Sequence, residues 1–433
     1  MSANALAIIL ISLVILLATG VPIAFSIGIA SIITIITTVP ADVATLTAAQ
    51  RTFVGMSSFT LTAIPFFILA GNLMNEGGIA KRLVDFVMAI LGKLPGALLV
   101  TNVGANALFG AISGSASAAA AAVGSMVKAG EEKQGYDKAV SASANGASAP
   151  AGLLIPPSNA LITYSLVSGG TSVAALFLAG YIPGLIWSIG CVIVAIAIAK
   201  KKGYKANEGK FSFAILGKAT LRALPSLGLI VVVIGGIVAG IFTATEGSAI
   251  SVLYSLILGF IYKNLNPKKV WNIVVESAKM SAIVVFLIGL SNILSWVMAF
   301  TGIPQMVGEA LLKVSDNKYV IFLIMNIILL ISGTFMDVTP AILIFTPLFL
   351  PIATEFGMHP VQFGLMIVYN LCIGNITPPV GNTLFVAIKV GDTSLSKVMP
   401  YMLRFYLAIL IGLLLVTYLP MTSLILPLKA GLI

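Results

Sequence analysis

Charged residues are scarce in this 433-residue sequence: only 9% are Asp, Glu, Lys or Arg, against about 25% in ordinary soluble domains. It holds a single histidine, His359, which excludes an HExxH zinc helix, and its position before Pro360 in a predicted loop argues against a histidine-based catalytic triad. Its two cysteines, Cys191 and Cys372, lie in apolar segments without paired spacing, so no disulfide framework is predicted. There is also no phosphate-binding G-x-x-x-x-G-K-[ST] sequence. These absences argue against an enzyme.

Long uncharged runs take the place of charge. The sequence is 59% hydrophobic, and no charged residue occurs between Lys138 and Lys200. One membrane-spanning helix needs only about 20 apolar residues, and the strict alternation of a membrane barrel is absent. The sequence therefore predicts an all-α polytopic membrane protein.

The formal net charge of +10 would suit a nucleic-acid partner, but the placement of the basic residues does not. Seven of them crowd into residues 200–222, between two apolar blocks. Such clustering is typical of a cytoplasmic loop under the positive-inside rule. We therefore expect lipid rather than nucleic acid around this chain. The charged residues Glu131, Glu132 and Lys133 likewise place the following turn at the surface.

The sequence contains two copies of one pattern. Pro156-Pro157 and Pro378-Pro379 are its only Pro-Pro pairs, and they lie 222 residues apart. At the same offset Gly152 matches Gly374, and Thr171-Ser172 matches Thr393-Ser394. Glycine and proline interruptions at corresponding places in two hydrophobic halves indicate an inverted-repeat transporter whose binding site lies at the breaks.

The segments preceding the diprolines are about 33 residues long, too long for one span and too short for two. A Gly/Ser break near 113–117 and another at 332–337 therefore predict two re-entrant helical hairpins, and each diproline predicts a broken helix. The expected domains are scaffold helices with an interfacial arm helix (1–94), repeat 1 (95–199, hairpin 95–127, broken helix 139–170), a basic loop (200–224), scaffold with a second arm helix at 271–279 (225–318), repeat 2 (319–404, hairpin 319–351, broken helix 363–390) and a last span (405–433).

Each break exposes backbone carbonyls beside hydroxyl and amide side chains, which are hard oxygen ligands suited to Na⁺ or similar ions. We predict two cation sites, one in each repeat. The first comprises Ser113, Gly114, Ser115, Pro156, Ser158 and Asn159, and the second comprises Gly333, Thr334, Asp337, Thr377, Pro378 and Asn382. Ser117 and Ser332 are placed on the transport path. The bland alternative is that these small residues only allow helices to pack closely in lipid.

Two carboxylates lie within apolar segments, where a charge is costly and by default indicates function. Asp337 follows the second hairpin break, so we assign it to the ion site or to the organisation of the hairpin tip. For Glu246 a place on the transport path and a role as an internal polar staple stay equally open.

At these residues the chain resembles the large membrane subunit of tripartite ATP-independent periplasmic (TRAP) transporters. The similarity runs almost end to end. It is carried by AIPFFILAGNLMNEGGIAKRL (63–83), ALFGAISGSASA (107–118), LLIPPSNALITYS (153–165), GIFTATEG (240–247), SGTFMDVTPAILIFTPLFLPI (332–352) and GNITPPVGNTLFV (374–386).

The resemblance implies a Na⁺-driven importer in the bacterial inner membrane, working as an elevator. Its partners would be a separate small membrane subunit and a periplasmic substrate-binding protein. The implied substrate is a small organic anion, with sialic acid favoured and a C4-dicarboxylate next. A stand-alone ion-coupled carboxylate carrier without a binding protein and an uncoupled channel or scaffold are the alternatives.

Overall fold

The computed structural model describes residues 2–206 and 213–433, and within these ranges the regular secondary structure is entirely helical. Six described helices are long and apolar enough to cross a membrane, or up to eight when each of two bent helix pairs is taken as one span. This confirms the predicted polytopic all-α class.

The N-terminal scaffold consists of short helices separated by the predicted proline and glycine breaks. Because Pro22 lacks a backbone donor and comes directly before a helix, it separates the first two segments. The helices are α1 (Ser2–Ala18), α2 (Ile23–Thr38), α3 (Ala41–Met56), the 3₁₀ turn η1 (Phe59–Thr62), α4 (Ala63–Glu76) and the amphipathic α5 (Ile79–Leu91).

Repeat 1 has the predicted hairpin and broken helix. The hairpin helices α6 (Ala97–Ser113) and α7 (Ala116–Lys133) meet at Gly114-Ser115. The broken helix consists of α8 (Lys138–Ser148), α9 (Ala151–Leu154) and, after the diproline, α10 (Asn159–Val167). The repeat ends in the long span α11 (Val173–Lys202).

Repeat 2 contains the same parts in the same order. The hairpin helices α16 (Lys318–Gly333) and α17 (Val338–Glu355) are joined by a turn at 334–337. The broken helix is α18 (Pro360–Gly374) and α19 (Asn382–Val390), and it is followed by the span α20 (Leu395–Tyr418) and the short α21 (Met421–Lys429). Each predicted break therefore falls between two helices.

The middle segment differs from the prediction in two places. The basic loop expected over 200–224 is shorter, because α11 continues to Lys202 and α12 (Phe213–Val238) is already helical at Lys218 and Arg222; Lys210 lies outside the described residues. The helix α13 (Ala244–Ile261) follows.

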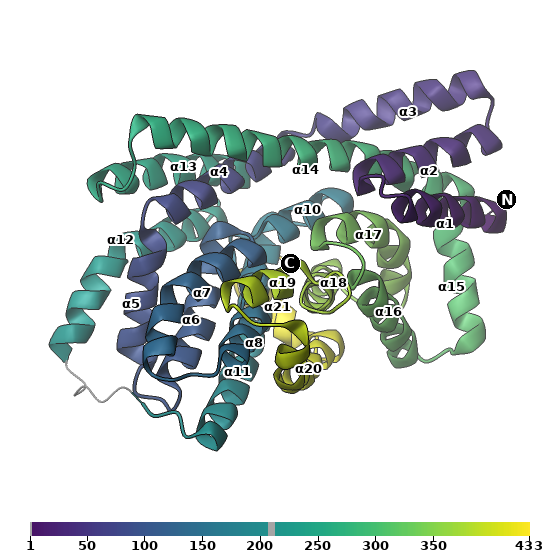
Figure 1. Cartoon of the computed structure of the whole chain (residues 1–433). Helices are drawn as coiled ribbons and strands as arrows, with labels where there is room; N and C mark the ends of the chain where they lie inside the picture. The colour runs from purple at the N-terminus through teal and green to yellow at the C-terminus, as the bar shows by residue number, and fades with distance from the viewer. Residues whose placement is uncertain (1, 207–212) are drawn as a thin grey trace.

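The separate arm helix expected at 271–279 is wrong as a unit. It belongs to the continuous 35-residue helix α14 (Pro267–Thr301), because no proline or glycine interrupts the sequence between Pro267 and Gly289. The helix α15 (Ile303–Val314) connects α14 to the second hairpin. In Figure 1, α14 crosses the molecule above both hairpins, alongside α3 and α13.

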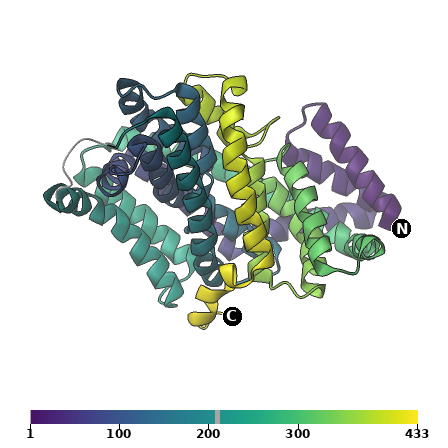
Figure 2. The ribbon, with the colours of Figure 1, turned by 90° about the horizontal axis from the view of Figure 1, so that it is seen from below.

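The two repeats interlock through the short helices that follow the diprolines. Helix α10 of repeat 1 packs against α17 of repeat 2, and α19 of repeat 2 packs against α7 and α8 of repeat 1. The spans α11 and α20 also pack against each other and run side by side (Figure 2). Each hairpin therefore contacts helices from both halves of the chain.

Paired glycines set the distance between each hairpin and its broken helix. A Cβ added at Gly152 would lie 2.2 Å from the Cα of Gly110, and one added at Gly374 would lie 2.4 Å from the main chain of Gly333. Real Cβ atoms do not approach a backbone this closely. The Gly152–Gly374 match in the sequence thus reports the same close backbone contact in both repeats.

We expect Gly152→Ala and Gly374→Ala each to lower the free energy of unfolding by about 1–3 kcal/mol, because the added methyl group overpacks a backbone contact. Thermal unfolding of the purified protein measures the effect. Gly235→Ala is the control, since a Cβ there has open space around it. Equal unfolding temperatures for all three variants would contradict the proposed glycine contacts.

Candidate ion and substrate site

Both hairpin tips and both helix breaks meet at one cavity of about 220 Å³. The hairpin and break residues that line it include Ser113, Gly114, Ser115, Ser117, Asn159, Asp337 and Asn375. The opposite wall comes from α4 and α14 through apolar side chains such as Ile68 and Val284 and through the polar Asn72. The cavity therefore lies between the two repeats and the scaffold.

Three helix N-termini open on this cavity. Its lining includes residues 116–118 at the start of α7, 159 and 160 at the start of α10, and 338 and 339 at the start of α17. Helix N-termini carry partial positive charge and free N–H groups, so they favour anionic groups. The backbone alone thus supplies an environment suited to a carboxylate.

Side chains cap these three helices. The hydroxyl of Ser115 accepts from the N–H of Ala118 (3.3 Å), and Asp337 Oδ1 accepts from the N–H of Val338 (2.9 Å). Ser158 Oγ accepts from the N–H of Leu161 (3.4 Å) and donates to the carbonyl of Leu153. Because Ser158 is fully buried and held by these bonds, it supports the break rather than lining the cavity.

Each break contributes an amide oxygen without a partner. Asn159 Oδ1 and Asn375 Oδ1 are buried, line the cavity and have no hydrogen-bond partner among the described residues. Unpaired buried acceptors are costly, and both face a space where oxygen ligands are useful. Within 2–206 and 213–433 no group of three or more His, Cys, Asp or Glu side chains gathers for metal binding, so candidate cation ligands are chiefly neutral oxygens.

Glycine is required at the first hairpin tip. Gly114 adopts a left-handed φ of 63°, and a Cβ there would lie 2.7 Å from Nδ2 of Asn159. The tip and the start of α10 are therefore in direct contact, as predicted for the first site. At the second site the tip meets its break through a main-chain bond from Val380 to the carbonyl of Thr334 (3.2 Å).

Several predicted residues support this arrangement without lining the cavity. The hydroxyls of Thr334 and Thr377, which lie just after α16 and α18, donate to carbonyls of those helices, at Ile331 (2.7 Å) and Ile373 (2.6 Å). The other predicted residues outside the lining are Pro156, Ser332, Gly333, Pro378 and Asn382.

Glu246 lies away from the cavity. It forms a capping box with Thr243 at the start of α13, where its Oε2 accepts from the Thr243 N–H (2.7 Å) and the Thr243 hydroxyl accepts from the Glu246 N–H (3.3 Å). The structure therefore places it as a helix cap.

The prediction missed Asn375 and Thr383. Asn375 lies three residues before the second diproline, outside the predicted set of Thr377, Pro378 and Asn382. Thr383 is the partner of Ser117, with 3.2 Å between the two hydroxyl oxygens. This bond links the tip region of hairpin 1 to α19. Asn159 follows the first diproline, whereas Asn375 precedes the second. The offset of 222 residues that relates the two diprolines therefore does not relate these two asparagines.

A cavity at paired helix breaks in an all-helical membrane protein defines a transport protein rather than an enzyme. Residues 10–422 match the family described as Tripartite ATP-independent periplasmic transporter, DctM component. The chain belongs to this family and is a multi-pass permease of the bacterial inner membrane.

Three relatives match nearly their whole length. The chain is 50% identical to the uncharacterized protein YgiK of Salmonella typhimurium (96% of this chain, 95% of that one). It is 38% identical to the C4-dicarboxylate TRAP transporter large permease protein DctM of Rhodobacter capsulatus (96% and 97%) and 36% identical to the sialic acid permease SiaM of Vibrio cholerae (95% and 96%). The last two identities are too similar to single out the sialic-acid branch.

The fold also resembles a solved transporter. The crystal structure of YdaH from Alcanivorax borkumensis superposes with a TM-score of 0.60 at 13% identity, covering 83% of this chain and 85% of that one. This likeness concerns the fold alone.

The Ser117–Thr383 contact provides a test of the interlocked repeats. We expect the double variant Ser117→Cys/Thr383→Cys to form a disulfide under mild oxidation, because the paired oxygens lie 3.2 Å apart. The two native cysteines are buried, so gel mobility under non-reducing conditions reports the new bond. Each single cysteine variant is the control, and a double variant that stays reduced would contradict the contact.

Proposed function

We propose that this permease imports a small organic anion together with Na⁺, through an elevator movement of the two interlocked repeats. The observation that carries the proposal is the shared cavity, which joins oxygen ligands for a cation to helix N-termini for an anion. The substrate is handed over by a periplasmic binding protein, as the family description implies.

Two Na⁺ sites, one at each break, form the cation part of the proposal. Asn159 Oδ1 beside the first hairpin tip supports the first site, and Asn375 Oδ1 with the carboxylate of Asp337 supports the second. Amide, carbonyl and carboxylate oxygens suit a hard cation. A cation in the second site would also compensate Asp337, the only acidic side chain in the cavity lining.

The anion part rests on the three helix N-termini and the hydroxyls of Ser117, Thr163 and Thr339. These groups can donate hydrogen bonds to a carboxylate, and a bound Na⁺ strengthens the attraction. The binding order follows from charge: Na⁺ binds first, neutralises Asp337 and leaves a site that accepts the anion.

The moving body consists of the hairpins and broken helices, and α4 and α14 belong to the scaffold. A Cβ added at Gly71 on α4 would lie 2.7 Å from the carbonyl oxygen of Ser113. The hairpin tip therefore contacts the scaffold where α4 has no side chain to obstruct its movement. Because DctM and SiaM are named large permease proteins, we also propose a separate small membrane subunit as partner.

The substrate class stays open between sialic acid and a C4-dicarboxylate. Sialic acid is the first compound to test, followed by the dicarboxylate, each offered on its own binding protein.

Reconstituted permease, with the small subunit and a loaded binding protein, should take up substrate only when a Na⁺ gradient is applied. Replacing Na⁺ by K⁺ is the matched control and should reduce uptake to background, because a larger cation does not fit ligands set for Na⁺. Equal uptake with K⁺ would contradict the coupling. Uptake by the chain alone would instead indicate a stand-alone carrier.

Asp337→Ala should reduce uptake roughly tenfold or more, since losing even a residue that only supports a metal ligand typically lowers metal affinity or activity about tenfold to a hundredfold. The amount of protein inserted in the membrane should stay unchanged. Asp316→Ala, at an exposed position between α15 and α16, is the control. Near-normal uptake by Asp337→Ala would remove this carboxylate from the site.

A further inference from the structure

A second, small cavity lies at the other end of hairpin 1. It has a volume of about 20 Å³ and is bounded by the end of α7, α6, the start of α8 and the end of α19. Its polar lining includes Asn102, Glu131, Tyr136 and Ser141. None of these residues lines the transport cavity, so this is a separate site.

The acidic residue in this cavity is almost completely buried. Glu131 is 5% exposed, and Asn102, Tyr136 and Ser141 are 1%, 7% and 7% exposed. Glu131 Oε1, Ser141 Oγ and Asn102 Nδ2 form no hydrogen bond of good geometry among the described residues, although Ser141 and Asn102 lie close enough to act on the carboxyl group. The cavity therefore places a carboxylate beside hydrogen-bond donors and has space for one water molecule. This arrangement forms a polar site.

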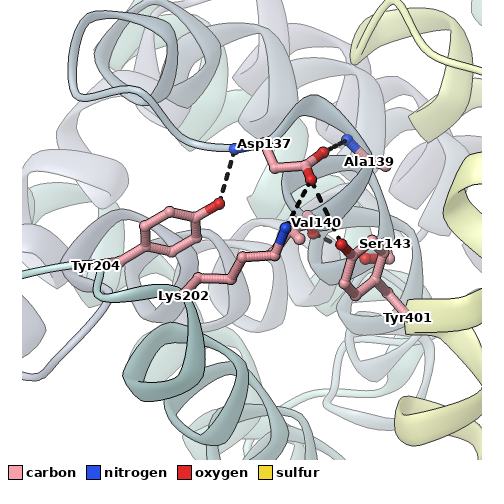
Figure 3. Close-up of polar contacts among 7 residues, drawn as sticks. All are labelled: Asp137, Ala139, Val140, Ser143, Lys202, Tyr204 and Tyr401. Carbon is pink, nitrogen blue, oxygen red and sulfur yellow. Dashed lines mark hydrogen bonds and ion pairs between the residues drawn. The ribbon is translucent and has the colours of Figure 1, made fainter.

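The turn after Glu131 is held in place, so the carboxyl group cannot escape to water. Figure 3 shows Asp137 accepting hydrogen bonds from Lys202 (3.0 Å), from the N–H of Ala139 (2.9 Å) and from the Tyr401 hydroxyl (3.4 Å). The N–H of Asp137 donates to the Tyr204 hydroxyl (2.8 Å). These bonds tie the turn to α11 and α20.

The adjacent aromatic pair adds to this restraint. Tyr136 stacks on Tyr204 with the ring centroids 4.2 Å apart. Because Tyr136 and Asp137 are both held in place, the fold keeps Glu131 buried.

Charged neighbours do not neutralise Glu131. The charged groups lining the same cavity are Lys128 and Glu132 on α7 and Lys138 on α8; the lining residues from α6 and α19 are uncharged. Lys138 is already bound to Asp392 (2.9 Å) and lies 3.8 Å from Glu132.

Burial raises the pKa of the Glu131 carboxyl to about 7; Ser141 and Asn102 act in the opposite direction, and the nearby Glu132 charge adds a smaller rise. Glu131 lies in the polar last turn of α7, which is not among the candidate membrane spans.

We propose that Glu131 is a proton-binding site of the transport body, and that its protonated form is the one in which hairpin 1, α8 and α19 move as one unit. One proton from solution converts the carboxylate to a neutral carboxylic acid, which then shares hydrogen bonds with Asn102 and Ser141. When the proton leaves, the buried negative charge has no cation among the described residues to pair with, and this weakens the packing of the end of α7 against α8 and α19. Uptake therefore depends on pH through a residue remote from the substrate.

The first test compares the pH dependence of uptake at equal pH on both sides and constant Na⁺. For a group with a pKa near 7 the protonated fraction falls about tenfold from about pH 6 to about pH 8, and we expect a comparable fall in uptake by the wild-type protein. Glu131→Gln mimics the neutral form, so its uptake should stay high across this range. Glu309→Gln, at an exposed position on α15 outside the lining of this cavity, should keep the wild-type profile. A wild-type profile for Glu131→Gln would overturn the proposal.

The second test does not need transport. Infrared difference spectra of the purified protein should show a protonated carboxyl band that titrates near neutral pH and is lost in Glu131→Gln. The absence of this band would refute the proton site, whereas its presence without any uptake would count against the proposed transport function only.

The raised pKa of Glu131 also predicts how the stability of the folded protein depends on pH. Below the ordinary glutamate pKa of 4.5, Glu131 is neutral in both the folded and the unfolded protein. As the pH rises from 4.5 to about 7, the unfolded protein releases this proton more readily than the folded protein, so the wild-type protein loses stability. The unfolding temperature of Glu131→Gln should exceed that of the wild type increasingly over this window and by a constant amount above it. A constant difference at all pH values would contradict the titration.

Discussion

The contact between each hairpin and its broken helix is the constraint on which the other features depend. In lipid, every interrupted helix leaves backbone groups that must be paired or must face a cavity. Gly110 with Gly152, and Gly333 with Gly374, let the hairpin backbone approach the broken helix directly. Because this happens in both repeats, the open helix ends at the breaks converge on one cavity instead of facing lipid.

That convergence creates two environments in one space. The helix N-termini at the tips provide partial positive charge, while Asn159, Asn375 and Asp337 provide oxygen ligands. A cation and an organic anion can therefore occupy neighbouring positions and attract each other. The packing of α10 against α17 and of α19 against α7 joins the two repeats, as the proposed elevator movement requires.

The breaks could be predicted from sequence because their signals are local. The diprolines, Gly114 and the turn before Asp337 each interrupt a helix through their own backbone preferences, without help from distant residues. The positions of the hairpin tips and the contact of the first tip with Asn159 followed from this, whereas α7 continues to Lys133, beyond the expected end of the first hairpin at 127. The pairing of one repeat's short helix with the other repeat's hairpin could not be predicted, since it depends on packing between segments more than 150 residues apart.

Side-chain roles were harder to predict for the same reason. Glu131 is followed directly by charged residues and was expected at the surface, but the anchored turn at Asp137 keeps it buried. Glu246 lies in an apolar segment, so its sequence suggests a buried charge. The structure shows instead that α13 begins at Ala244 and that Glu246 caps its first turn.

The central claim is that both hairpin tips face one Na⁺-occupied cavity. It is tested most directly by the labelling rates of single cysteines at Ala118→Cys and Thr339→Cys, which line the cavity from opposite tips. We predict that Na⁺, but not K⁺, slows reaction with a small thiol reagent at both positions. Labelling rates that do not respond to Na⁺ at either tip would contradict the account.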